Sequence, residues 1–170
     1  FNRLSKPINN SQNERQAIDL VKQLIYTCVL PSVLQKLKNQ LTENNIIEIM
    51  DIAVNLLISY PNWFNEIIPS INEIIPLTKS FYNAASVIKL YENVIKYHNT
   101  FFEKKSYKNI DEKVILSCST LGILFDTFPN ILQSNTENMI DIILMSLSSE
   151  KIQPYVYPHV IRLTSSAIKS

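Results

Sequence analysis

A single glycine, Gly122, stands in a chain of 170 residues that also contains eight prolines. Glycine allows a backbone to turn with positive φ or to approach a ligand closely, so phosphate-binding loops, dinucleotide fingerprints and nucleophile elbows need several glycines. Enzymes with such sites are therefore not expected. Proline is common where a helix begins. The combination predicts helices joined by short connections that start with proline.

Apolar residues recur at helical spacing along most of the chain, and no segment shows sustained two-residue alternation. Ile46, Met50, Ala53 and Leu57, for example, form one apolar stripe. With 46% hydrophobic residues, the chain has enough apolar surface for one compact unit or a short repeat array. We therefore predict an all-α protein in which residues 1–11 are a flexible lead-in and residues 12–170 form a helical repeat domain.

The stripes, prolines and capping residues also predict where the helices lie. Helices are expected at residues 12–30, 31–41, 43–60, 62–77, 80–102, 111–128 and 135–148, and from Pro154 or Pro158 to the end. Pro69 lacks an N–H donor, so it should kink the segment 62–77 or divide it into two half-helices. Asp111 is expected to cap its helix, and Ser134 with Glu137 to form a capping box.

An internal repeat at an offset of 38 residues is the strongest signal in the sequence. The stretch Leu30-Pro31-Ser32-Val33 matches Ile68-Pro69-Ser70-Ile71, so each contains a proline where a first helix is expected to start. A whole helix then matches in register. The aligned pairs are Ile49 with Val87, Met50 with Ile88, Ile52 with Leu90, Asn55 with Asn93, Leu56 with Val94 and Leu57 with Ile95. Stacked two-helix repeats require this pattern, because each hairpin buries its face only against its neighbours. Chance matching in an isoleucine-rich chain is the alternative.

On these residues the sequence resembles a HEAT/armadillo-type α-solenoid over about residues 30–170. Asp111-Glu112-Lys113-Val114, followed by Cys118, Leu121 and Gly122, is similar to the start of a HEAT second helix, although Ile115 stands where an arginine is usual. Tyr60-Pro61 and Phe128-Pro129 are similar to the ends of second helices in importin-β/exportin karyopherins. The resemblance implies a right-handed α-solenoid of about four antiparallel hairpins that binds proteins, and the likeness to karyopherins implies a piece of a nucleocytoplasmic transport receptor.

An acidic strip is the first candidate for partner binding. Between Lys38 and Lys79 there are five acidic residues and no Lys or Arg, and Glu48, Asp51 and Asn55 share one helix face in this stretch. A solenoid presents its second helices on the concave side, so the strip could receive a basic partner segment. The alternative is a solvated face in which Asp51 pairs with Lys89 of the neighbouring helix.

Two asparagines at equivalent repeat positions, Asn55 and Asn93, are the second candidate. In armadillo proteins, to which the sequence is similar, an asparagine ladder binds the backbone of an extended peptide, because an amide both donates and accepts hydrogen bonds. The companion tryptophan of that pattern is absent here, since Asp51 and Lys89 stand four residues earlier. Ordinary exposed asparagines are the alternative. The predicted partner-binding residues are thus Glu48, Asp51, Asn55, Lys89 and Asn93.

Two further groups could contact a partner, but each has a plainer interpretation. The aromatic pair Trp63 and Phe64 could anchor a partner or pack between hairpins. The loop with Lys104, Lys105, Tyr107 and Lys108 could touch phosphate or be solvated.

Neither catalysis nor a cofactor is expected. His98 and His159 lie in no metal-ligand spacing, so no metal site and no catalytic residues are predicted. The net charge is +1 with three arginines, which argues against direct nucleic-acid binding. No small-molecule substrate is expected. No apolar run has the length of a membrane span, so membrane insertion is not expected either.

The two cysteines, Cys28 and Cys118, each lie in an apolar helical pattern and are expected to be buried free thiols. This favours a reducing compartment, the cytoplasm or the nucleus. The chain does not begin with methionine, so we expect it to be a piece of a larger protein. Together these features predict a non-catalytic protein-binding scaffold. The alternatives are a structural segment of a multi-subunit assembly and a closed helical bundle with a ligand or active site.

Overall fold

The structure is a computed structural model that describes residues 10–26, 32, 40–80, 82–103 and 109–169. Every regular element within these residues is a helix, so the all-α prediction is confirmed. The α-helices are α1 (Asn10–Leu24), α3 (Glu43–Ser59), α4 (Phe64–Ile74), α5 (Ala84–Glu103), α6 (Ile110–Thr127), α7 (Pro129–Leu132), α8 (Thr136–Ser148) and α9 (Tyr157–Lys169). The helix expected at residues 31–41, like most of the lead-in, lies almost entirely outside the described residues.

Proline begins several of the helical segments, as the sequence predicts. Pro61 and Pro154 open the short 3-10 turns Pro61–Trp63 and Pro154–Val156 that lead into α4 and α9, and Pro129 opens α7. A third 3-10 turn, Ile75–Thr78, follows α4. Pro69 lies inside α4, which is one continuous helix and not two half-helices.

Two of the predicted caps are wrong. Asn109, with a left-handed φ of 60°, is the N-cap of α6, and Asp111 lies in the first turn instead. Asn135 precedes α8 without a side-chain capping bond. Ser134 belongs to the 3-10 turn Gln133–Asn135. A capping side chain needs an extended backbone at its residue, and a chain that enters α8 through a helical turn does not provide one.

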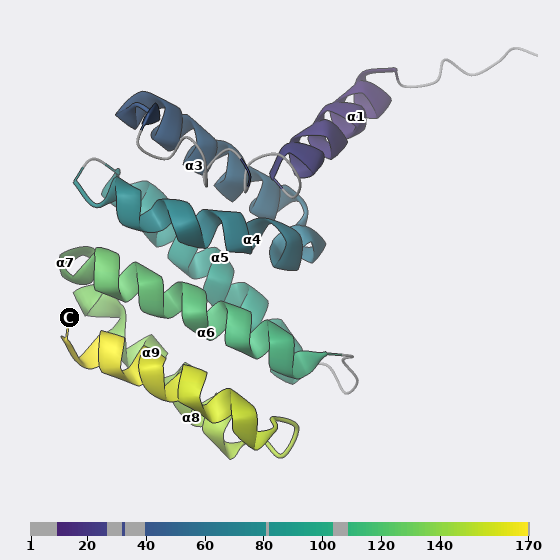
Figure 1. The fold of residues 1–170 in the computed structure, drawn as a ribbon. Helices are drawn as coiled ribbons and strands as arrows, with labels where there is room; N and C mark the ends of the chain where they lie inside the picture. The colour runs from purple at the N-terminus through teal and green to yellow at the C-terminus, as the bar shows by residue number, and fades with distance from the viewer. Residues whose placement is uncertain (1–9, 27–31, 33–39, 81, 104–108, 170) are drawn as a thin grey trace, which may run out of the picture.

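The helices form two rows (Figure 1). Helices α4, α6 and α9 lie side by side in one row, and α3, α5 and α8 lie behind them in the other. The consecutive pairs α3–α4, α5–α6 and α8–α9 pack across the rows, and α7 makes the turn between α6 and α8. The core therefore lies between the rows and between neighbours within each row.

Helices α3 and α5 run in the same direction. The hydroxyl of Tyr82, just before α5, donates to Asp51, and further along the pair Lys89 Nζ donates to Asn55. Residue numbers rise together on both helices, which is possible only for parallel neighbours. The helix matched at an offset of 38 residues is thus the adjacent helix in the same row.

Helix α6 is packed on both of its sides within the row, between α4 and α9. Its buried residues accordingly cover a wide arc, with Val114, Leu121 and Phe125 wholly enclosed. Gly122 lies on the side of α9, where an added Cβ would stand 3.7 Å from Ser166 Oγ. Helix α6 is the second helix of the pair α5–α6 and lies in the same row as α4 and α9.

Helix α1 projects from the stack at its N-terminal end and touches α3 and α4 near its C-terminal end (Figure 1). Tyr60 Oη donates to Asp19 at 2.6 Å, and Ser70 Oγ donates to the carbonyl of Tyr26 at 2.8 Å. The apolar stripe of α1 is largely uncovered, with Ile18 54% and Val21 56% exposed.

Candidate functional site

Four of the five predicted binding residues have exposed or half-exposed side chains along the line where α3 and α5 meet, here called the α3/α5 seam. Lys89 Nζ donates to Asn55 Oδ1 at 3.2 Å, and Asn93 Nδ2 donates to the carbonyl of Lys89 at 2.7 Å. The structure therefore brings Asn55, Lys89 and Asn93 into one connected group. Asp51 lies one turn earlier on α3.

The fifth residue, Glu48, is exposed one turn before Asp51. It lies close enough to Tyr26 for its charge to act on the phenol: burial raises the pKa of Tyr26, and the Glu48 carboxylate raises it further. Tyr26 in turn donates to the carbonyl of Ile49. The acidic end of the seam is thus placed beside the C-terminal end of α1.

Asp51 does not pair with Lys89. It is half-buried and accepts a hydrogen bond of 3.1 Å from the hydroxyl of Tyr82, whose pKa is raised by burial and by the Asp51 charge. Lys89 reaches Asn55 instead. The reason is the register of the two helices: Tyr82 stands level with Asp51, and Lys89, seven residues after Tyr82, stands level with Asn55.

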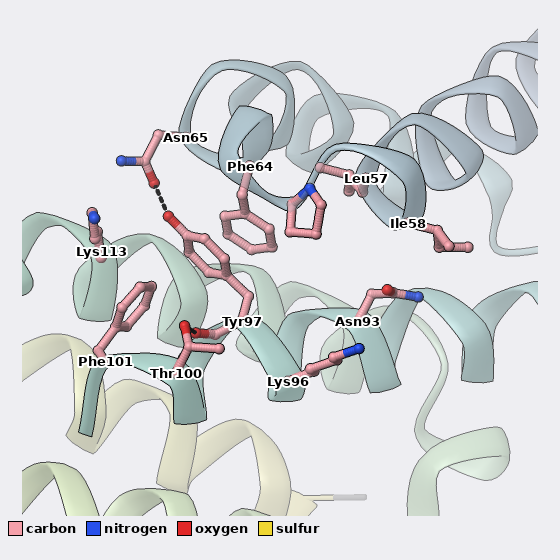
Figure 2. A pocket seen from close by; sticks show the side chains of 11 residues that line it. Leu57, Ile58, Phe64, Asn65, Asn93, Lys96, Tyr97, Thr100, Phe101 and Lys113 are labelled. Carbon is pink, nitrogen blue, oxygen red and sulfur yellow. Dashed lines mark hydrogen bonds between the residues drawn. The ribbon is translucent and has the colours of Figure 1, made fainter. Parts of the chain in front are cut away.

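At the far end of the seam is a pocket of about 420 Å³ (Figure 2). It lies where the end of α3 and the start of α4 face the second half of α5 and the first turn of α6. The residues that line it are Leu57, Ile58, Pro61, Phe64, Asn65, Asn93, Lys96, Tyr97, Thr100, Phe101 and Lys113. Asn93 belongs to both the seam and the pocket, so the two form one continuous surface.

Three aromatic rings form the floor of the pocket (Figure 2). Phe64 and Tyr97 are stacked with centroids 3.6 Å apart, and Phe101 meets the Tyr97 ring edge-on at 4.5 Å. The Tyr97 hydroxyl donates to Asn65 Oδ1 at 2.6 Å. Because Phe64 and Phe101 are almost wholly buried, the position of the half-exposed Tyr97 ring is held from both sides.

Two lysines stand at the edge of the pocket. Lys96 is exposed on α5, and Lys113 of α6 places its ammonium 5.3 Å from the centroid of the Phe101 ring, a cation–π contact. The eleven lining residues include no acidic side chain. The seam is therefore acidic at the end with Glu48 and Asp51 and basic at the end with the pocket.

Only some of the residues that line this pocket could be predicted from the sequence. Phe64 is one of its floor residues, whereas its neighbour Trp63 stacks on Tyr60 at 4.2 Å, outside the pocket. Lys96 and Thr100 continue the α5 face of Lys89 and Asn93 at spacings of three and four residues, a signal that could have found them. Lys113 comes from another helix, and nothing local connects it to this face. The lysine loop at residues 104–108 lies outside the described residues.

A second polar group lies wholly inside the protein, where α5, α6 and α8 meet. His98 Nδ1 is 2.8 Å from Ser117 Oγ and Nε2 is 3.1 Å from Ser146 Oγ. All three residues have no exposed surface, and burial lowers the pKa of His98 to about 4. The imidazole is therefore neutral at pH 7. The group joins α5, α6 and α8 in the interior of the protein.

The remaining chemically notable groups do not gather into a site. Cys118 is a buried free thiol, and burial raises its pKa to about 12, while Cys28 lies outside the described residues. In the described part of the chain, no group of three or more His, Cys, Asp or Glu side chains could hold a metal ion. No single described helix has the length and apolar composition of a membrane span. The bent pair Ile110–Thr127 and Pro129–Ser148 meets that test only when the two are taken together.

Comparison with known proteins gives no match: no family model fits the chain, and no curated protein or solved structure is significantly similar to it.

Proposed function

We propose that this protein is a non-catalytic helical-repeat scaffold, an α-solenoid of the HEAT/armadillo type, that binds an extended segment of a partner protein along the α3/α5 seam. The observation that carries the proposal is the seam itself. Two helices that match in sequence lie parallel as neighbours and align Asn55, Lys89 and Asn93 on one surface. Membership of the importin-β/exportin class remains a prediction from the sequence resemblance.

The arrangement in two rows supports the repeat interpretation. A solenoid buries each hairpin only against its neighbours, so it needs one row of first helices and one row of second helices. In the pairs that pack across the rows, α3, α5 and α8 are the first helices and α4, α6 and α9 are the second.

The charges along the seam support a peptide partner with a basic residue at its acidic end. Glu48 is exposed, and Asp51 offers a carboxylate that is held by Tyr82. A lysine or arginine of the partner placed there would gain from both charges, and complementary charge increases the rate and the specificity of association.

Binding can be tested with short peptides displayed on phage and selected on the purified protein. The enriched peptides should contain Lys or Arg, and Glu48→Lys should weaken their binding by about tenfold or more. Glu48 is the better position for charge reversal, because Asp51 also holds Tyr82. Glu73→Lys makes the same charge change at an exposed residue of α4, in the other row, and should leave binding unchanged. Equal binding by the protein and its Glu48→Lys variant would contradict the proposed surface.

A second function, a structural segment of a larger assembly, is favoured by the apolar surface at both ends of the stack. Ile161 and Ile168 of α9 are 60% and 78% exposed, and Ile18 and Val21 of α1 are more than half exposed. Ile161 and Ile168 line a groove of about 540 Å³ between α8 and α9. Inner helices of a repeat array are covered on both sides, and end helices without polar caps are not.

Sedimentation velocity separates the two functions. A structural segment should associate end to end as its concentration rises, and Ile161→Lys with Ile168→Lys should abolish that association while Glu48→Lys leaves it unchanged. A monomer at all concentrations, combined with peptide binding at the seam, would exclude the structural function.

A further inference from the structure

We propose that the pocket at the end of the α3/α5 seam holds an aromatic side chain of the partner segment, and that an acidic residue adjacent to it in the partner contacts Lys96 and Lys113. This inference rests on the proposed function and adds the chemistry of the partner. It assigns the segment a basic residue at one end of the seam and an acidic–aromatic pair at the other.

The aromatic part follows from the floor and the size of the pocket. A volume of about 420 Å³ lies within the range of roughly 300–1,000 Å³ that is usual for ligand pockets. The floor consists of the rings of Phe64, Tyr97 and Phe101 (Figure 2), and Pro61 and Ile58 also line the pocket. Aromatic rings in contact gain about 0.5–1.5 kcal/mol beyond the area they bury. The half-exposed Tyr97 ring is the part of this floor that a partner ring can contact, so the floor favours an aromatic side chain.

The acidic part follows from the polar atoms at the pocket edge. Lys96 and Lys113 supply two ammonium groups, and Lys113 is held over the Phe101 ring. Asn65 accepts from Tyr97 through Oδ1, which leaves its Nδ2 group to donate. The two ammonium groups make this edge positive. A carboxylate of the partner is attracted by that charge, whereas a lysine or arginine of the partner would be repelled.

The spacing along α3 and α5 sets the distance between the two parts of the partner. Asn55 lies four residues after Asp51 on α3, and Tyr97 of the floor lies eight residues after Lys89, which reaches Asn55, on α5. These twelve helical residues correspond to about 18 Å. An extended peptide covers about 3.3–3.6 Å per residue. The basic residue and the aromatic residue of the partner should therefore be about five positions apart.

The test uses the same phage-displayed peptides, selected in parallel on the protein and on the double variant Lys96→Gln with Lys113→Gln. The control is Lys79→Gln with Lys169→Gln, which removes two positive charges from exposed residues outside the pocket. Thermal unfolding followed by circular dichroism verifies that all three proteins are folded. A synthetic copy of the most enriched peptide, labelled with fluorescein, then gives the affinity of each protein by fluorescence anisotropy.

The expected result is an enriched motif with Asp or Glu next to Phe, Tyr or Trp, and an affinity about tenfold or more weaker in the double variant but not in the control. An acidic–aromatic motif that binds the double variant equally well would overturn the inference. Enriched peptides that lose binding in Glu48→Lys but contain no such motif would overturn it and leave the proposed function intact. If no peptide is enriched on the protein, both are overturned.

Discussion

At the scale of single residues, the sequence identifies chemically notable side chains but not their surroundings. His98 stands in no ligand-like spacing, and in the structure it lies between two serines from other helices. Its ring also lies 5.1 Å from that of Phe102. A buried neutral imidazole satisfied by two hydroxyls links α5, α6 and α8 without leaving an unpaired polar group in the core.

We predict that His98 makes the protein less stable in mild acid. Its pKa is about 4 in the folded protein and about 6.5 in the unfolded chain, so the unfolded chain binds more protons between these values. Stability should therefore be full above about pH 6.5 and fall as the pH is lowered toward 4, by up to about 3 kcal/mol. Urea unfolding at pH 7 and pH 5 measures this. The variant His98→Gln should show a smaller difference between the two pH values, and an equal difference would contradict the assignment.

At Gly122 the structure predicts that alanine is tolerated. A Cβ there would be in ordinary van der Waals contact with Ser166, and Gly122 has no positive φ. Replacing a helical glycine by alanine stabilises a protein by about 0.4–1 kcal/mol when the backbone and the space allow it. Urea unfolding of Gly122→Ala should show unchanged or higher stability. A loss greater than about 1 kcal/mol would mean that α6 and α9 pack more closely than described.

At the scale of the helices, a side chain of one helix can fix the position of another segment through hydrogen bonds. Asp111, expected as the cap of its own helix, accepts hydrogen bonds from the backbone N–H of Gln153 at 3.1 Å and from the hydroxyl of Tyr155 at 2.7 Å. It therefore fixes the turn before α9 against the first turn of α6. The sequence shows an acidic residue at a helix start, but not the segment that donates to it.

Asp111→Ala should lower stability more than Glu112→Ala. Both carboxylates lie in the first turn of α6, so both interact to the same extent with the positive N-terminal end of the helix dipole. Only Asp111 accepts from the turn before α9, and the bond from Gln153 alone is worth about 0.5–1.5 kcal/mol. Thermal unfolding of the two variants makes the comparison. Equal losses would show that the bonds to Gln153 and Tyr155 contribute nothing.

Helix positions were largely predictable, because apolar periodicity and prolines are local signals. The ends of α3 and α6 fall within one residue of the expected ends. The capping residues were less predictable: Asn109 with its left-handed backbone and the 3-10 turn before α8 depend on how the next helix is placed. The candidate site divides in the same way. The α3 and α5 residues of the seam follow from the repeat, whereas Lys113 joins the pocket only through the packing of α6.

At the scale of the whole molecule, the two rows of helices extend along one axis (Figure 1). A compact domain of this length has a radius of gyration near roughly 15–16 Å. Small-angle X-ray scattering of the monomer should therefore give a clearly larger value. A value within that range would favour a closed helical bundle over an open array.

The proposed binding surface is the α3/α5 seam with its pocket. The most direct test is to map amide shift changes in the ¹⁵N-labelled protein by NMR when the most enriched peptide is added. The largest changes should fall on Asn55, Asn93 and Lys96 and on the pocket floor. Changes that spare both the seam and the pocket, for example changes confined to the exposed apolar face of α9, would contradict binding at this surface.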